Sequence, residues 1–185
     1  MTLTKTPVCD FGIKAKDFKL KSINNELVSL NDVKGEKATL IMFICNHCPY
    51  VKAIIKDLIT DCKELKKEGV NSVAIMSNDT KNYPADSFEN MIKFAKENQF
   101  ENINYLIDET QEIAKNYEAV CTPDFFGYNK NLELQYRGRF RELKDLKPVK
   151  NGDSDLKLSM KMVSKTQKGP DEQIPSMGCN IKWFN

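Results

Sequence analysis

Residues 38–62 of the chain read ATLIMFICNHCPYVKAIIKDLITDC, and the periodicity of the apolar residues changes within this stretch. Its first part, Ala38 to Ile44, is an apolar run of strand length, which is typical of a strand buried on both faces. From Val51 the apolar residues fall at 51, 54, 55, 58, 59, 62 and 65, which predicts one buried face of a helix. Cys45 and Cys48 form a C-x-x-C motif at the junction.

The segments that follow alternate in the same way. Val70 to Met76 reads as a second buried strand, and a helix over roughly 85–98 precedes a third strand over 103–107. This order predicts a parallel α/β sheet with right-handed crossovers. Around it the sequence predicts hairpins at 18–30 and 125–136, short elements at 111–119 and 179–184, and a helix that Ser154 caps.

Length and charge limit the classes of protein that fit. The 185 residues contain no linker or repeat, so we expect one domain over 1–185, with a core over about 15–140 and a C-terminal extension over about 141–185. A net charge of +2 is too small for a general nucleic-acid binder, and no apolar run approaches the roughly 20 residues that cross a bilayer. The first residues lack the pattern of a signal peptide, so we expect a cytoplasmic protein without membrane or nucleic-acid partners.

The C-x-x-C motif is predicted to lie at the N-terminus of a helix, where unpaired N–H groups and the helix dipole stabilise an anion. The dipole alone is worth up to ~2 kcal/mol, enough to lower a thiol pKa by about one unit. His47 lies between the cysteines and adds a stabilising charge when it is protonated. We therefore expect Cys45, as the more N-terminal and more exposed thiol, to be the nucleophilic thiolate.

Four segments of the sequence resemble the thioredoxin superfamily, and more closely its peroxiredoxin-like, AhpC/TSA-type branch: FICNHCPYV at 43–51, CTPDFFGYN at 121–129, YRG at 136–138 and PSMGCNIKW at 175–183. The resemblance implies an α/β thioredoxin-like fold with an N-terminal β-hairpin, a peroxiredoxin/TlpA-type insertion over 85–107 and a C-terminal extension. It also implies that Pro123 is a cis-proline facing the cysteines, and that the backbone of Thr122 pairs with an extended substrate peptide.

The sequence departs from both parent patterns. Thioredoxins carry a buried acid six positions before the first cysteine, where this chain has Thr39, so His47 is the nearest substitute as proton acceptor. The peroxiredoxin pattern P-x-x-x-T-x-x-C-P places Cys45 at the threonine and Cys48 at the peroxidatic cysteine, and only the final C-P is retained.

These observations predict a thiol-disulfide oxidoreductase without a cofactor. Cys45 attacks a protein or small-molecule disulfide, Cys48 resolves the mixed disulfide, and Thr122 and Pro123 shape the substrate groove. A reducing partner such as a thioredoxin and its reductase regenerates the dithiol. The alternative is a thiol peroxidase with antioxidant activity, in which Cys48 or Cys45 reduces a hydroperoxide through a sulfenic acid. A third class is a Cys/His metal carrier; a resident metal site is not predicted, because the chain has one histidine and no second C-x-x-C.

Three further residues are candidates for auxiliary roles. Cys179 lies in the terminal motif and is a candidate auxiliary thiol. Cys121 precedes Pro123 by two residues and either approaches the redox cysteines or packs at the end of a buried strand. Arg137 is the first of three arginines at alternate positions, which share one face if a strand continues through them; they mark either an anionic partner or a solvated basic edge.

Overall fold

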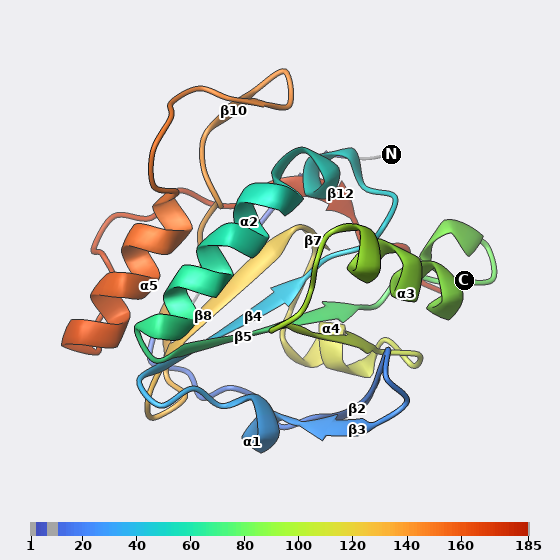
Figure 1. Cartoon of the computed structure of the whole chain (residues 1–185), viewed down its shortest axis with the longest axis horizontal. Helices are drawn as coiled ribbons and strands as arrows, with labels where there is room; N and C mark the ends of the chain where they lie inside the picture. Colours follow the sequence, from blue (N-terminus) through green and yellow to red (C-terminus); the bar gives the residue numbers. More distant parts are fainter. Residues whose placement is uncertain (1–2, 7–10, 185) are drawn as a thin grey trace.

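The computed structural model describes residues 3–6 and 11–184 and has three layers, with helices on both faces of a mixed sheet (Figure 1). The order of the seven sheet strands is β3-β2-β6-β5-β4-β8-β9. Their bounds are β2 Lys19–Ser22, β3 Leu27–Ser29, β4 Ala38–Phe43, β5 Val70–Met76, β6 Asn104–Ile107, β8 Asp124–Asn129 and β9 Leu134–Tyr136. β4, β5 and β6 are parallel, whereas β2 and β8 join them in antiparallel fashion. The predicted parallel α/β core is confirmed.

The central strand β4 is buried along its whole length because both of its faces are covered. Leu40 and Met42 belong to the apolar cluster under α2 (Pro49–Lys67), α3 (Phe88–Glu97) and α5 (Asp155–Thr166). Ile41 and Phe43 point the other way, as successive residues of a strand do, into the cluster under α1 (Leu30–Val33) and α4 (Glu112–Asn116). This double burial explains why the strand shows no polar alternation.

Helix α2 begins where the sequence predicts it. All seven residues of the predicted apolar stripe are buried. Pro49 occupies the first turn, and Cys48 is the N-cap residue, with φ −63° and ψ 123°. This extended conformation is the one that a following proline favours. Gly69, with φ +81°, lies directly after the helix and lets the chain turn into β5.

The C-terminal part of the chain completes the core. Ser154 caps α5, and Leu156, Met160 and Val163 are all fully buried against the face that α2 covers. The predicted cap and apolar face of this helix are thus confirmed. In Figure 1 α5 lies beside α2, and the two helices pack together.

The predicted terminal strand begins two residues and ends four residues earlier than expected. β12 (Met177–Asn180) is the middle strand of a small second sheet, between β1 (Leu3–Lys5) and β7 (Cys121–Thr122). These neighbours come from distant parts of the sequence, and the local pattern therefore does not define the bounds of β12.

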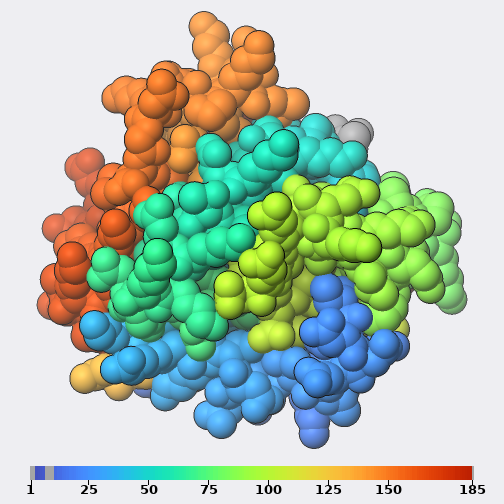
Figure 2. All heavy atoms as spheres, viewed as in Figure 1, coloured from blue at the N-terminus to red at the C-terminus, as the bar shows by residue number. Residues whose placement is uncertain are grey.

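Two smaller features complete the description. α3 starts at Phe88, later than predicted, because Ser87 caps it and a 3-10 turn, η1 (Pro84–Asp86), precedes it. A hairpin of β10 (Leu143–Lys144) and β11 (Lys147–Pro148) lies within the orange region that projects from the body in Figure 2. No helix in the described part of the chain is both long and apolar enough to span a membrane.

Candidate redox site

The two cysteines of the C-x-x-C motif lie where β4 ends and α2 begins. Both side chains belong to the apolar core on the α2 side of the sheet, with exposed fractions of 1% for Cys45 and 0% for Cys48. The predicted strand-to-helix junction is confirmed, but the expectation that Cys45 is the more exposed thiol is wrong. The loop turns both thiols inward, so accessibility does not distinguish them.

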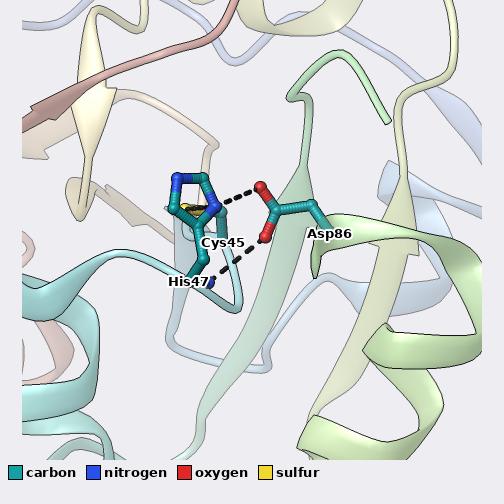
Figure 3. Close-up of side chains that lie close together, drawn as sticks. All are labelled: Cys45, His47 and Asp86. Carbon is teal, nitrogen blue, oxygen red and sulfur yellow. Dashed lines mark hydrogen bonds and ion pairs between the residues drawn. The ribbon is translucent and has the colours of Figure 1, made fainter. Parts of the chain in front are cut away.

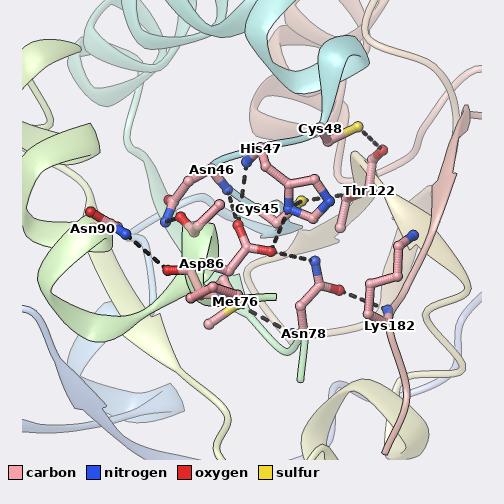
Figure 4. A network of polar contacts seen from close by, with 12 residues as sticks. Cys45, Asn46, His47, Cys48, Met76, Asn78, Asp86, Asn90, Thr122 and Lys182 are labelled. Atoms are coloured by element: carbon pink, nitrogen blue, oxygen red, sulfur yellow. Dashed lines mark hydrogen bonds and ion pairs between the residues drawn. The ribbon is translucent and has the colours of Figure 1, made fainter. Parts of the chain in front are cut away.

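Thr122 contacts both thiols (Figure 4). Its hydroxyl oxygen is 3.3 Å from Cys45 Sγ, and the Cys48 thiol donates a 3.0 Å hydrogen bond to its carbonyl oxygen. The peptide bond between Thr122 and Pro123 is cis, as the resemblance implied. The fold therefore brings together residues that the sequence separates by more than seventy positions.

The backbone of Thr122 is already paired within the chain. β12 runs antiparallel to β7, and Cys179 is the residue opposite Thr122. A Cβ atom on Gly178 would clash with the Thr122 carbonyl oxygen, so the close approach of the two strands requires glycine there. We expected this backbone to be open to a substrate peptide. The chain's own strand β12 occupies that position, which corrects the expectation.

A buried carboxylate, Asp86, lies beside the cysteine loop (Figure 3). Asp86 Oδ2 is 2.6 Å from His47 Nδ1, and the same ring nitrogen is 3.9 Å from Cys45 Sγ. The sequence led us to expect His47 as the substitute for a missing acid. The structure corrects this: an acid is present, it comes from η1, and His47 is paired with it.

Four hydrogen-bonding contacts hold the Asp86 carboxylate. The His47 ring supplies one, the backbone amides of Asn46 and His47 donate at 2.8 and 3.3 Å, and Asn78 Nδ2 donates at 2.8 Å. Asn78 also accepts a 2.8 Å hydrogen bond from the Lys182 amide, which connects the C-terminal segment to this network (Figure 4). No sequence signal separates Asp86 from the other acids, because its place depends on how the segment after β5 folds back.

The surroundings of Cys48 favour its thiolate. The hydrogen bond with the Cys45 thiol is the largest influence; burial opposes it, and the Val51 amide and the Cys179 thiol add to it, so the pKa of Cys48 falls from 9.0 to about 5. Ionisation gives up the hydrogen bond to the Thr122 carbonyl, which only the protonated thiol can donate. The surrounding donors replace that bond.

Cys45 is in the opposite situation. Hydrogen bonding with Cys48, then burial, then the negative charge of Asp86 raise the pKa of Cys45 well above its ordinary value. We expected Cys45 to be the thiolate, and this is corrected: Cys48 ionises first. The reason is that the loop brings Cys48 to the first turn of α2 and leaves Cys45 facing Asp86.

The remaining described cysteines are buried in different surroundings. Cys121 donates to the Pro123 carbonyl at 3.4 Å, and burial raises its pKa, which fits the packing interpretation. Cys62 lies on the buried face of α2, and burial raises its pKa to about 12. Cys179 is 3% exposed, and burial followed by its hydrogen bond with Cys48 raises its pKa to about 12. Cys9 lies outside the described residues.

The three arginines do not share a face, because β9 ends at Tyr136 and the chain leaves the sheet. Arg137 is buried and forms a 3.2 Å ion pair with Asp124. Arg139 and Arg141 pair with acids of α5 and α2. The interpretation as one basic edge is thus wrong, and the contacts of Arg137 support a packing role rather than an auxiliary role at the thiols.

One group of described residues has the ligand types for a metal ion: Cys45, His47 and Asp86, whose ligand atoms lie within 4.8 Å of one another. Hydrogen bonding already accounts for this arrangement. Both oxygens of Asp86 have partners, and the 2.6 Å separation of His47 Nδ1 and Asp86 Oδ2 is that of a hydrogen bond. The site therefore fits thiol chemistry better than metal transfer.

A C-x-x-C cysteine pair at the start of a helix on a thioredoxin-like fold is typical of thiol-based redox proteins. Comparison with known proteins identifies the family within this class. The model of the AhpC/TSA family matches residues 11–140, and the chain belongs to this family. The solved structures include an uncharacterised conserved protein from Geobacillus kaustophilus, 38% identical, with a TM-score of 0.94 over 100% of this chain and 97% of that one. A hypothetical protein from Sinorhizobium meliloti is 34% identical, with a TM-score of 0.90 over 98% of both chains.

More distant similarity concerns the fold alone. The thioredoxin domain of a thiol-disulfide oxidoreductase from Bacteroides vulgatus is 18% identical, with a TM-score of 0.59 over 70% of this chain and 89% of that one. The peroxidoxin BcpB from Mycobacterium tuberculosis is 15% identical, with a TM-score of 0.56 over 67% and 81%. No curated protein matches the chain. The thioredoxin-like fold inferred from the sequence is thus confirmed, and the family is one of redox proteins.

Proposed function

We propose that the protein is a thiol-disulfide oxidoreductase in which Cys45 and Cys48 cycle between dithiol and disulfide. The observation that carries the proposal is that both thiols lie at the start of α2 against Thr122, beside a cis-proline, with Cys45 Sγ 3.3 Å from its hydroxyl oxygen and Cys48 Sγ 3.0 Å from its carbonyl oxygen. The surroundings favour the thiolate at Cys48 and the protonated thiol at Cys45. Such a pair supplies a thiolate for attack and keeps a protonated thiol beside it for resolution.

The geometry suggests the following sequence of steps. The Cys48 thiolate attacks one sulfur of a substrate disulfide, and the other sulfur leaves as a thiolate. Cys45 then loses its proton and attacks Cys48 Sγ, which releases the second half of the substrate as a thiol and closes the Cys45–Cys48 disulfide. The nearest acceptor for the Cys45 proton is the pair of His47 and Asp86. A reducing partner such as a thioredoxin system restores the dithiol.

A groove of about 480 Å³ near the start of α2 and the cis-proline supports a place for the substrate. Tyr50 and Ile54 from the first turns of α2 line one side, and Pro123 lies in it next to Thr122. Ile174 and Met177 on the other side are 54% and 37% exposed. We propose that this groove holds the groups that flank a substrate disulfide, because Tyr50 and Pro123 in its lining are close in sequence to Cys48 and Thr122.

Peroxidase activity is the second candidate, and one observation favours it. Cys48 is followed by Pro49 and is the N-cap residue of α2, and its surroundings lower its pKa to about 5. It therefore matches the peroxidatic cysteine of the peroxiredoxin pattern. A peroxidatic cysteine also needs donors that polarise the O–O bond. Cys45 replaces the threonine that peroxiredoxins use, and a thiol is a weaker donor than a hydroxyl. We therefore place disulfide exchange first.

Single-turnover reactions of the reduced protein test this ranking. With oxidised glutathione the wild type should close the Cys45–Cys48 disulfide and release two molecules of glutathione. Cys45→Ser should still release the first, whereas Cys48→Ser should release neither at a comparable rate. With hydrogen peroxide the wild type should react no faster than an ordinary thiolate. A reaction with hydrogen peroxide that is orders of magnitude faster than that of an ordinary thiolate would make the protein a peroxidase. If Cys48→Ser releases the first glutathione as fast as the wild type, Cys45 is the attacking thiol.

A further inference from the structure

β12 occupies the position at Thr122 where a substrate strand was expected. Cys179 lies opposite Thr122 in the pairing register. Side chains of directly paired residues lie on the same face of a sheet. Cys179 therefore lies on the face of Thr122 whose hydroxyl oxygen is 3.3 Å from Cys45 Sγ.

Cys179 also contacts the reactive thiol directly. Its side chain is hydrogen-bonded to that of Cys48. Cys45, Cys48 and Cys179 belong to one apolar cluster, and each is at most 3% exposed. The three thiols thus belong to one buried group around Thr122, which contacts Cys45 and Cys48 and pairs with Cys179.

Several contacts hold β12 in this place. Gly178 allows the close approach to the Thr122 carbonyl oxygen. The Ser176 hydroxyl donates a 2.7 Å hydrogen bond to the Pro123 carbonyl, and after the strand the Lys182 amide donates to Asn78. The strand is anchored at both ends, so the position of Cys179 is a product of the fold and not of a loose chain terminus.

We propose that Cys179 is a third redox thiol, which forms a disulfide with Cys48 by exchange with the Cys45–Cys48 disulfide. The proposal rests on the dithiol function argued above. The Cys179 thiolate attacks Cys48 Sγ, the Cys45–Cys48 bond breaks, and Cys45 leaves as a thiolate that takes up the proton lost by Cys179. One disulfide is consumed and one is formed, so the step needs no further oxidant.

The exchange gives the site two ways to resolve Cys48. A mixed disulfide on Cys48 can be resolved by Cys45 or by Cys179. In the second case the resulting disulfide includes a cysteine of β12, the strand whose Met177 lines the substrate groove. Burial and then the neighbouring Cys48 raise the pKa of Cys179, and a Cys48 disulfide removes the contribution of Cys48. The oxidation state of Cys48 thus contributes to the reactivity of Cys179.

The test uses the full-length Cys45→Ser protein and oxidised glutathione. The glutathione adduct on Cys48 should disappear as an internal Cys48–Cys179 disulfide forms, which peptide mapping by mass spectrometry identifies after an acid quench. In Cys45→Ser with Cys179→Ser the adduct should persist roughly a hundredfold longer or more, because a thiol held in place acts at a high effective concentration. Cys45→Ser with Cys121→Ser is the matched control and should behave like Cys45→Ser alone.

A lasting Cys48–glutathione adduct in Cys45→Ser, with Cys179 still open to alkylation after unfolding in acid, overturns the proposal. If circular dichroism shows that the Cys45→Ser protein does not fold, the wild-type protein provides the test. After oxidation to equilibrium, peptide mapping should find the Cys48–Cys179 disulfide in a fraction of the molecules. Absence of this disulfide would also overturn the proposal. Failure of the dithiol function has a different signature, because then the wild type does not form the Cys45–Cys48 disulfide at all.

Discussion

Cys45 and Cys48 have opposite electrostatic surroundings although only Asn46 and His47 separate them. Cys48 has thiol donors and the Val51 amide around it, whereas Cys45 faces the charge of Asp86. Burial acts on both in the same direction, so hydrogen bonds and one carboxylate decide which thiol ionises. The chemistry of the site is therefore set by contacts of individual residues, and two of our predictions concern single residues.

The first prediction is that one thiolate titrates at about pH 5 in the reduced wild type, and that it belongs to Cys48. Cys48→Ser should remove this titration. Cys45→Ala should shift it upward, because it removes the largest of the stabilising hydrogen bonds, yet leave it below the value of an ordinary thiol. Ultraviolet absorbance of the thiolate measures each curve, and Cys121→Ser serves as control. A titration that survives in Cys48→Ser would assign the thiolate to Cys45.

The second prediction concerns Asp86. Asp86→Asn removes the charge that helps to raise the Cys45 pKa and keeps an oxygen for the Asn46 and His47 amides. In a Cys48→Ser background, Asp86→Asn should therefore lower the pKa of Cys45. Glu97→Gln, an exposed acid on α3, should leave it unchanged. Equal titration curves for the two substitutions would show that Asp86 does not act on Cys45.

The sequence could predict only part of this site. The thiols, His47 and Thr122-Pro123 are recognisable because they belong to short motifs with fixed spacing. The order of ionisation was not predictable, because it depends on Asp86 and on which residue is the N-cap of α2. Both are properties of the folded chain: Asp86 reaches the loop from another segment, and the start of α2 at Pro49 makes Cys48 its N-cap residue.

At the scale of elements, the N-terminus of α2 links the redox state to stability. The folded-state pKa of Cys48, about 5, is below the value of 9.0 expected for the unfolded chain. A lowered pKa contributes stability that is complete above the unfolded value and is lost as the pH falls through the folded value. The disulfide form has no Cys48 thiol to titrate. The reduced form should therefore gain stability over the oxidised form as the pH rises from about 5 to about 9.

The third prediction gives this effect a size. Each pH unit in that window corresponds to about 1.4 kcal/mol, so the free energy of unfolding of the reduced form relative to the oxidised form should rise by ~2–3 kcal/mol between about pH 5 and pH 7. Urea unfolding of both forms at the two pH values measures it. Cys121→Ser, which retains both redox cysteines, should show the same change. Parallel pH profiles for the two forms would contradict a lowered Cys48 pKa.

The elements differ in how well the sequence predicts them. α2, β4 and β5 have long periodic or wholly apolar patterns, and they form at the expected places. β1 and β12 are three and four residues long and exist because they pair with each other and with β7. Short strands of this kind carry no pattern of their own, since their stability comes from partners far away in the sequence.

At the scale of the whole molecule, the region that matches the AhpC/TSA family is not the whole of the core. The family match ends at residue 140, but α5 covers part of the sheet beside α2. The contact is polar as well as apolar. The Ser154 hydroxyl donates a 2.6 Å hydrogen bond to Asp61 of α2, and Lys157 forms ion pairs with Asp61 and Glu64. The part after residue 140 thus supplies both a layer of the fold and the strand that lies against the thiols.

The last prediction follows from this distribution of the core. A chain that ends at Asp153 lacks α5 and β12 and exposes the surface that Leu156, Met160 and Val163 bury. Full burial of three such side chains is worth about 5–9 kcal/mol, and a typical domain has only about 5–15 kcal/mol of stability. We expect the shortened chain to lose cooperative unfolding in urea. Replacing the exposed turn residues of the hairpin by Asp145→Asn and Leu146→Gly should change the unfolding free energy little, because both positions have positive φ, which Asn-Gly favours. If the shortened chain unfolds cooperatively, with the same dependence of its unfolding free energy on urea concentration as the wild type, the core is complete without α5.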